Sequence, residues 1–161
     1  GFISKKRPVL GVAYFPALNL FYSAEKGKGA FLNGEKIFNS SKEGSITAYS
    51  SGFHRRPQAQ PILEKLNIGK VLEEGSVLKL ARIAEGVADF YPRFGPTSEW
   101  DTAACQVLLN EAGCELWDVR TMQPLKYGKE NYANHGFIAF RRDLMPKIKE
   151  LFTNIQWKRP Q

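Results

Sequence analysis

The chain has 161 residues, of which 43% are hydrophobic, 12% aromatic and 24% charged. This length suits one domain with a buried core, and the composition excludes intrinsic disorder, a collagen helix and a coiled coil. No apolar run approaches the roughly 18 residues that a membrane-crossing helix needs, so we expect no membrane span. Cys105 and Cys114 follow no zinc-ligand or disulfide pattern, and this cysteine usage favours the cytoplasm.

The formal net charge of +7 is unevenly distributed along the chain. Residues 1–60 carry nine Lys and Arg against three Glu (+6), residues 61–130 carry eight against eleven acidic residues (−3), and residues 131–161 carry six against two (+4). The basic residues form only short groups without interleaved aromatic residues, so nucleic acid is the least favoured partner. A small phosphorylated ligand needs only one or two well-placed cations and stays open.

The N-terminal part of the sequence has the pattern of an antiparallel meander. Apolar β-formers over residues 9–15 are interrupted by a proline and resume over residues 18–22, which predicts a strand, a turn and a second strand. Turn sequences at residues 26–29 and 33–34 flank a short apolar stretch, residues 30–32.

Strand and helix patterns alternate through the rest of the chain. Strands are predicted at residues 46–51, 70–72, 88–93, 114–118 and 136–140, and helices at residues 62–66, 76–86, 101–112 and 144–152. In the second of these helices, apolar residues recur on one face and Gly86 is placed to end the helix. The fold class that we expect is therefore α/β, in layers, with an antiparallel meander at the N-terminal end.

Four groups that could act on a phosphate occur near the ends of these predicted elements. Ser76 begins one helix and Lys79 lies one turn later on the same face, where the helix N-terminus attracts anions. Asp101 begins another helix, and Arg93 ends the strand before it. Trp100 is bulky enough to wall off one side of such a site.

Each of these residues also has a purely structural interpretation. Asp101 and Ser76 suit helix N-caps, Lys79 and Arg93 suit solvent-exposed surface positions, and Trp100 suits the core. Residue chemistry does not by itself choose between the two interpretations.

The order of several short motifs is more specific. Gly-Ser-x-x-Lys at 75–79, Ala-Asp-x-Tyr-Pro-Arg-Phe-Gly-Pro-Thr at 88–97 and Trp-Asp-Thr-Ala-Ala at 100–104 occur in sequence, within a likeness covering about residues 8–140. This set resembles the C-terminal portion of the inositol monophosphatase family of magnesium-dependent, lithium-sensitive phosphatases, and within it the bacterial 3'(2'),5'-bisphosphate nucleotidases.

The resemblance implies a fold and a division of the chain. It implies a layered α/β sandwich of the sugar-phosphatase type, in which residues 1–45 are strands of the family's N-terminal sheet and residues 46–161 form the C-terminal α/β domain. The family's N-terminal catalytic half would be absent from this sequence.

The resemblance also implies roles for individual residues. Asp101 matches the family's Trp-Asp aspartate, which is a ligand of a catalytic Mg²⁺ and helps to place the attacking water. Ser76, Lys79 and Arg93 match positions that hold the phosphate and the nucleotide. His54 lies in a region equivalent to a Ser-Arg-Ser-His segment, but residues 50–54 depart from that pattern, so its place in the site is an expectation with an equally strong structural alternative.

The family's other metal ligands are in a glutamate motif and an Asp-Pro-Ile/Leu-Asp-Gly-Thr motif, and the sequence contains neither. No Asp-Pro or Asp-Gly dipeptide occurs anywhere in it. Two-metal phosphoryl hydrolysis needs several carboxylates around each Mg²⁺, and one aspartate cannot supply them. We therefore expect this chain alone to bind catalytic Mg²⁺ poorly and to hydrolyse little or no phosphate ester.

Three functions follow, in order of preference. The first is the C-terminal portion of a nucleotidase that acts on a small phosphorylated nucleotide, adenosine 3',5'-bisphosphate, with an inositol monophosphatase-like phosphatase as its variant. The second is a non-catalytic nucleotide-binding or assembly module that retains the scaffold. The third is the basic nucleic-acid binder. If the strands over residues 9–22 belong to a larger sheet, their exposed edges and faces favour self-association.

Overall fold

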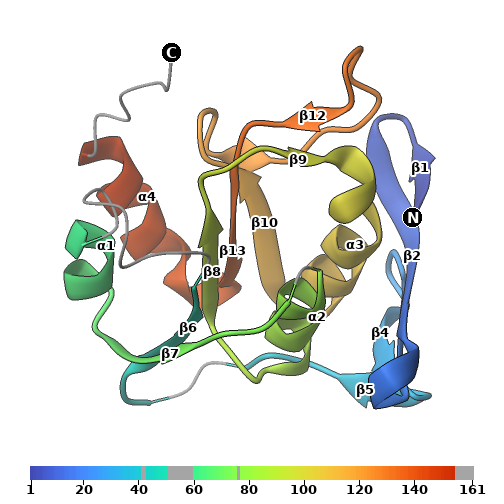
Figure 1. Cartoon of the computed structure of the whole chain (residues 1–161), viewed down its shortest axis with the longest axis horizontal. Coiled ribbons are helices and arrows are strands. Elements are labelled where there is room, and N and C mark those ends of the chain that lie inside the picture. The colour runs from blue at the N-terminus through green and yellow to red at the C-terminus, as the bar shows by residue number, and fades with distance from the viewer. Residues whose placement is uncertain (41–42, 51–59, 76, 155–161) are drawn as a thin grey trace.

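Helix α3 (Ala103–Glu111) lies between two β-sheets and contacts both of them (Figure 1). The structure is a computed structural model that describes residues 1–40, 43–50, 60–75 and 77–154. From the N-terminal side to the C-terminal side, its layers are one sheet, the helix pair α2 and α3, a second sheet, and the helix pair α1 and α4 (Figure 1). This arrangement is the layered α/β fold that the sequence predicts.

The first sheet is an antiparallel meander whose strands follow one another in chain order. It contains β1 (Phe2–Ser4), β2 (Arg7–Phe15), β3 (Leu20–Glu25), β4 (Gly29–Leu32) and β5 (Glu35–Ile37). The predicted turn at residues 33–34 joins β4 to β5, with φ of 50° at Asn33 and 87° at Gly34. These positive angles are the ones that Asn-Gly turns adopt at little cost, and the predicted meander is confirmed.

The inner face of this sheet packs closely against α3. Tyr22, Ala24 and Ala30 are buried there with residues of the helix. A Cβ atom at Gly11 of β2 would lie 2.2 Å from the Ala104 carbonyl oxygen, so only glycine allows the strand to approach the helix this closely.

The second sheet has the order β11, β10, β13, β8, β6, β7. Its strands are β6 (Ile46–Tyr49), β7 (Ile68–Leu72), β8 (Phe90–Arg93), β10 (Cys114–Asp118), β11 (Gln123–Pro124) and β13 (Phe137–Arg141). Strand β6 runs parallel to β7 and β8, and the other pairs are antiparallel. The short apolar run that the sequence predicts at residues 70–72 is part of the edge strand β7.

Helices cover both faces of this second sheet (Figure 1). On one face lie α2 (Leu78–Glu85) and α3, and on the other lie α1 (Gln60–Lys65) and α4 (Met145–Asn154). Gly86 ends α2 with φ of 91°, as predicted. Ile148, Leu151 and Phe152 of α4 pack with the second hydrophobic cluster of the sheet. No helix of the described residues is long and apolar enough to cross a membrane.

Two features near Asp101 differ from the sequence predictions. The helix predicted from Asp101 begins at Ala103, after a 3₁₀ helix, η4 (Glu99–Asp101), so Asp101 is not the N-cap of α3. Trp100, which suited the core, is 72% exposed, and its ring lies 6.4 Å from that of Tyr132. Glu99, before Trp100, and Thr102, two residues after it, are buried, so the 3₁₀ turn places the Trp100 side chain on its outward side.

Candidate functional site

Asp101 is placed by a short, well-tied turn at the start of α3. Its Oδ2 accepts a hydrogen bond from the backbone N–H of Ser98 at 2.8 Å, which closes η4 in the manner of a capping box. Ser98 in turn belongs to β9 (Thr97–Ser98), which pairs with β12 (Ala133–Asn134). The carboxylate is half-buried and its backbone is fixed from both sides.

Asp101 and Arg93 face the same pocket, although they come from different elements. The pocket has a volume of about 250 Å³ and is lined by Val77, Leu80, Tyr91, Arg93, Thr97, Asp101 and Phe137. Arg93 reaches it from the end of β8, and its Nε is buried without a hydrogen-bond partner among the described residues. The pocket therefore combines a carboxylate, a guanidinium and the hydroxyl of Thr97 above an apolar base.

Lys79 lies next to this pocket but is not among the described residues that line it. It is 6% exposed, so it is not the solvent-exposed charge of the structural alternative. Its ammonium donates a hydrogen bond to the Glu74 carbonyl at 2.8 Å and lies 5.1 Å from the centre of the Tyr91 ring. Burial lowers the pKa of Lys79, and the charge of Arg93 lowers it further. Lys79 thus ties the segment before α2 to the base of the pocket.

Ser76 and His54 lie outside the described residues, so the structure places neither of them. The residues on either side of Ser76 show only that α2 begins at Leu78, with Val77 already in a helical conformation.

A buried polar network that was not predicted from the sequence holds η4 in place. Glu99 is 8% exposed, and its carboxylate accepts hydrogen bonds from the backbone N–H groups of Gly128 at 2.8 Å and Lys129 at 2.9 Å. The Lys129 ammonium lies 3.1 Å from the same carboxylate. Three donors from one loop therefore converge on the residue two positions before Asp101.

Asn134 and Tyr127 extend this network. The Asn134 amide donates hydrogen bonds to the Ser98 carbonyl and to Thr102 Oγ1, both at 3.1 Å, and its oxygen accepts one from the Lys129 ammonium at 2.9 Å. The Tyr127 hydroxyl lies 3.2 Å from Thr102 Oγ1. Residues on both sides of Asp101 are thus tied to the loop that contains residues 127–134.

The loop lowers the pKa of the Glu99 carboxyl. Burial alone would raise the pKa of the Glu99 carboxyl, but the N–H groups of Lys129 and Gly128 and the Lys129 ammonium outweigh burial and lower the pKa. A local sequence signal for this network is hard to find, because Glu99 and Lys129 are 30 residues apart.

The described residues alone do not provide a magnesium site. Asp101 offers the hard oxygen ligand that Mg²⁺ prefers, but no group of three or more His, Cys, Asp or Glu side chains lies close enough, among those the structure describes, to hold an ion. No metal-dependent step can therefore be assigned to these residues on their own.

Replacing Glu99 by Gln tests its part in the network. Because the folded-state pKa of Glu99 is lowered, its charge stabilises the fold at pH values above the unfolded pKa of about 4.3, and this contribution disappears as the pH falls through the folded pKa. Glu99→Gln is expected to lower the free energy of unfolding by on the order of 2 kcal/mol at pH 7.

Urea denaturation at a series of pH values measures this difference. The gap between Glu99→Gln and the wild type should shrink as the pH falls below about 4. Glu130→Gln, which changes an exposed carboxylate in the same loop, is the matched control and should leave stability unchanged. A gap of the same size at low and neutral pH would contradict the charge-dependent role.

Comparison with known proteins identifies the family. The family model described as "Inositol monophosphatase family" matches residues 1–159. The 3'(2'),5'-bisphosphate nucleotidases CysQ of Shigella flexneri and of Escherichia coli K12 are each 35% identical to this chain over 138 residues. These matches cover 84% of this chain and 56% of each relative, so the chain spans a little more than half the length of these curated relatives.

Solved structures share the fold. CysQ from Bacteroides thetaiotaomicron, described as a bacterial member of the inositol monophosphatase family, is 30% identical with a TM-score of 0.75, covering 87% of this chain and 60% of its own. Inositol monophosphatase II from Staphylococcus aureus has a TM-score of 0.79 at 17% identity, covering 97% of this chain and 59% of its own, which is a likeness of fold alone. Because the family model matches residues 1–159, the chain belongs to the inositol monophosphatase family.

Proposed function

We propose that this chain is the C-terminal portion of a magnesium-dependent phosphomonoesterase of the 3'(2'),5'-bisphosphate nucleotidase type, with adenosine 3',5'-bisphosphate as the substrate. The observation that carries the proposal is the shared pocket of Arg93 and Asp101 in a chain 35% identical to CysQ nucleotidases. The Arg93 Nε is buried and has no hydrogen-bond partner among the described residues, and a planar guanidinium can donate two parallel hydrogen bonds to two oxygens of a phosphate.

In this proposal each residue in or beside the pocket has a separate role. Arg93 binds and orients the phosphate, while Lys79 and the Tyr91 ring hold the backbone segment before α2 in place. Asp101 contributes one oxygen ligand to the Mg²⁺ of a complete site, in which the metal would offset the phosphate charge and lower the pKa of the attacking water. Ser76, Lys79 and His54 remain proposed substrate contacts.

Binding of the nucleotide by the chain itself tests the role of Arg93. Arg93→Ala should weaken the binding of adenosine 3',5'-bisphosphate by at least about tenfold, because it removes a charge-assisted contact to the phosphate. Isothermal titration calorimetry measures the affinity, and Arg120→Ala, an exposed arginine outside the pocket, is the matched control.

The outcomes of this titration separate the substrate classes. A wide preference for inositol 1-phosphate over the bisphosphate would favour the inositol monophosphatase-like variant. No binding of the bisphosphate at millimolar concentration, or equal affinities of Arg93→Ala and the wild type, would contradict the proposed role of Arg93.

The second candidate is a non-catalytic nucleotide-binding or assembly module. It is favoured by one observation, that Asp101 has no acidic partners forming a metal site among the described residues. Both candidates predict nucleotide binding by this chain, and they differ in whether a longer form of the protein, with the missing acidic motifs, exists and turns the nucleotide over.

For this chain alone we expect no Mg²⁺-dependent release of phosphate above the uncatalysed rate, because a single carboxylate cannot hold two metal ions. A phosphate-release assay with adenosine 3',5'-bisphosphate and Mg²⁺ measures this directly. Release that depended on Mg²⁺ and disappeared in Asp101→Asn would show that the chain builds a working site without the missing motifs.

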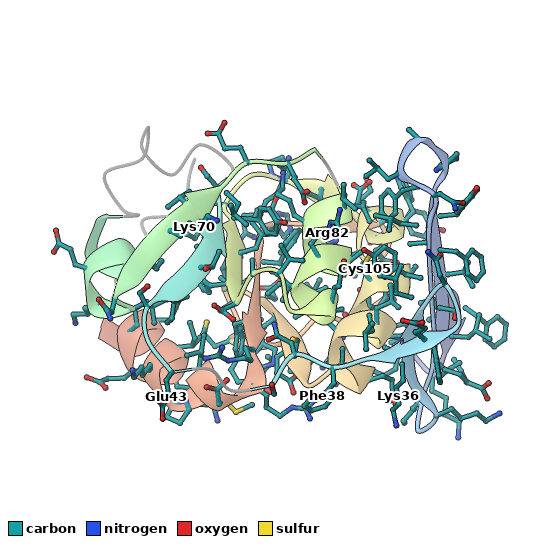
Figure 2. All side chains as sticks on the ribbon, turned by 90° about the horizontal axis from the view of Figure 1, so that it is seen from below. Lys36, Phe38, Glu43, Lys70, Arg82 and Cys105 are labelled. Carbon is teal, nitrogen blue, oxygen red and sulfur yellow. The ribbon has the colours of Figure 1, made fainter. Side chains whose placement is uncertain are left out.

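We also propose that the chain self-associates through the outer face of the first sheet. Phe2, Leu10, Val12, Tyr14 and Phe21 are between 42% and 64% exposed on its β1, β2 and β3 strands, and β1 and β5 are its edges. Figure 2 shows the aromatic side chains of this sheet projecting away from the rest of the molecule. A patch of this kind on a sheet commonly packs against another surface.

A charge placed in the middle of this face should prevent the association. Val12→Lys is expected to convert a concentration-dependent oligomer into a monomer, as measured by multi-angle light scattering. Val87→Lys is the matched control, because Val87 is 42% exposed, close to the 46% of Val12, but lies after α2 and away from the sheet. A wild-type chain that stays monomeric at high concentration would contradict the proposal.

A further inference from the structure

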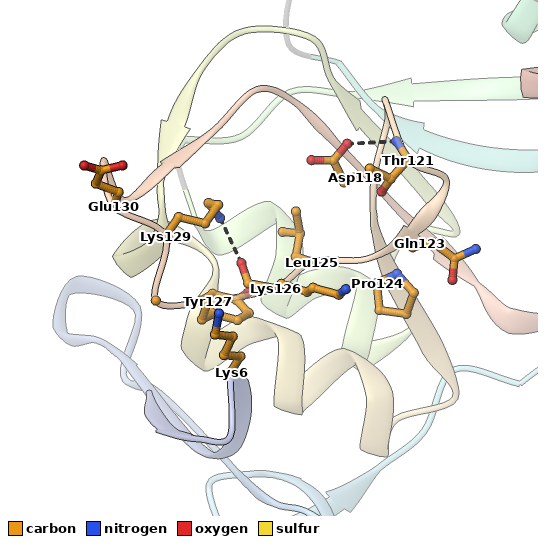
Figure 3. A pocket seen from close by; sticks show the side chains of 11 residues that line it. Lys6, Asp118, Thr121, Gln123, Pro124, Leu125, Lys126, Tyr127, Lys129 and Glu130 are labelled. Atoms are coloured by element: carbon orange, nitrogen blue, oxygen red, sulfur yellow. Dashed lines mark hydrogen bonds between the residues drawn. The ribbon is translucent and has the colours of Figure 1, made fainter.

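A second pocket is lined in part by residues 127–130, which belong to the loop that holds η4 in place. It has a volume of about 540 Å³ and opens between the β1–β2 turn, which contains Lys6, and the segment from Asp118 to Glu130 (Figure 3). This volume falls within the range of about 300–1,000 Å³ that is usual for small-molecule sites. The pocket shares no lining residue with the pocket of Arg93 and Asp101.

The walls of this second pocket are fixed before any ligand arrives. The Tyr127 N–H donates a hydrogen bond to the Lys6 carbonyl at 3.2 Å, which joins the β1–β2 turn to the loop. Leu125 and Tyr127 are buried at the base, and the next two N–H groups along the loop are held by Glu99. A rigid pocket binds a ligand with little ordering cost.

The turn at the mouth of the pocket has an unfavourable backbone. Lys5 and Lys6 both adopt left-handed conformations, with φ of 49° and 62°. Asn and Gly adopt such turns readily, whereas a residue with a long side chain does so at a cost in free energy. The turn thus has lysines where the backbone alone favours other residues, and such outliers are more common at functional positions than elsewhere.

The charged side chains that line the pocket are three lysines, Lys6, Lys126 and Lys129, and two carboxylates, Asp118 and Glu130. Neither Lys6 nor Lys126 forms an ion pair within the described part of the chain, and both are exposed at the opening (Figure 3). Lys129 is compensated by Glu99. The Asp118 carboxylate already accepts hydrogen bonds from the N–H groups of Arg120 and Thr121, and Glu130 is exposed to solvent.

We propose that this second pocket binds a small organic anion, with a flat apolar body against Pro124 and Leu125 and a phosphate or carboxylate group between Lys6 and Lys126. Apolar and cationic residues line the same pocket, so a bare inorganic ion would use only the lysines and a neutral apolar molecule only the apolar residues. The site is separate from the proposed nucleotide pocket and does not depend on the function assigned to Asp101.

Nuclear magnetic resonance of the ¹⁵N-labelled chain tests this proposal, with phenylphosphonate and benzoate as probes. Binding should shift the amide signals of Lys6, Tyr127 and Gly128 in a saturable manner. Benzyl alcohol and inorganic phosphate, which each lack one half of the ligand, should bind there at least about tenfold more weakly. The ratio of the two probe affinities shows whether the pocket favours phosphate or carboxylate.

The double substitution Lys6→Gln and Lys126→Gln should weaken binding of the preferred probe at this pocket by about tenfold, since each exposed cation contributes modestly. Lys36→Gln with Lys70→Gln, two exposed lysines outside the pocket, is the matched control. The spectrum of each variant reports whether it is folded. The proposal is overturned if these amides do not shift with either probe, or if the double variant in its folded state binds as tightly as the control.

Discussion

The packing of α3 between the two sheets is the constraint on which the rest of the molecule depends. Gly11 allows β2 to approach the backbone of the helix at Ala104, and the opposite side of the helix is buried against the second sheet. With the helix fixed on both sides, its N-terminal end has a single position. Asp101 lies one turn before Ala104, so the place of the candidate site is set by a contact between small residues.

A second constraint acts on the same turn from the polar side. A buried carboxylate such as Glu99 is costly unless its oxygens are paired, and here the pairing comes from two backbone N–H groups and one ammonium of a single loop. Removing any one donor would leave part of the charge buried without compensation. The loop and η4 therefore hold each other, and the loop also forms the base of the second pocket.

Local chemistry made much of this fold predictable. The turn at Asn33 and Gly34 could be predicted because those residues favour positive φ. The end of α2 could be predicted because Gly86 readily adopts a left-handed conformation. Ordered motifs around Arg93 and Asp101 pointed to the family, and the structure brings these two side chains to one pocket. Whether Ser76 and His54 join them stays a prediction.

Apart from the start of α3, the differences between prediction and structure concern burial. The structural alternative for Lys79 was the surface and that for Trp100 was the core, and the structure shows Lys79 buried and Trp100 exposed. In each case the decision depends on residues distant in sequence, such as Tyr91 under the Lys79 ammonium and Tyr132 beside the Trp100 ring. Periodicity within one helix carries no information about such partners.

Arg93 and Asp101 carry opposite charges in one small pocket, so a phosphate attracted by the guanidinium is repelled by the carboxylate until a cation intervenes. Under the proposed function, a metal cation would offset this repulsion. Glu99 holds η4 in place independently of the pocket, because its hydrogen-bond donors come from Gly128 and Lys129 of the loop.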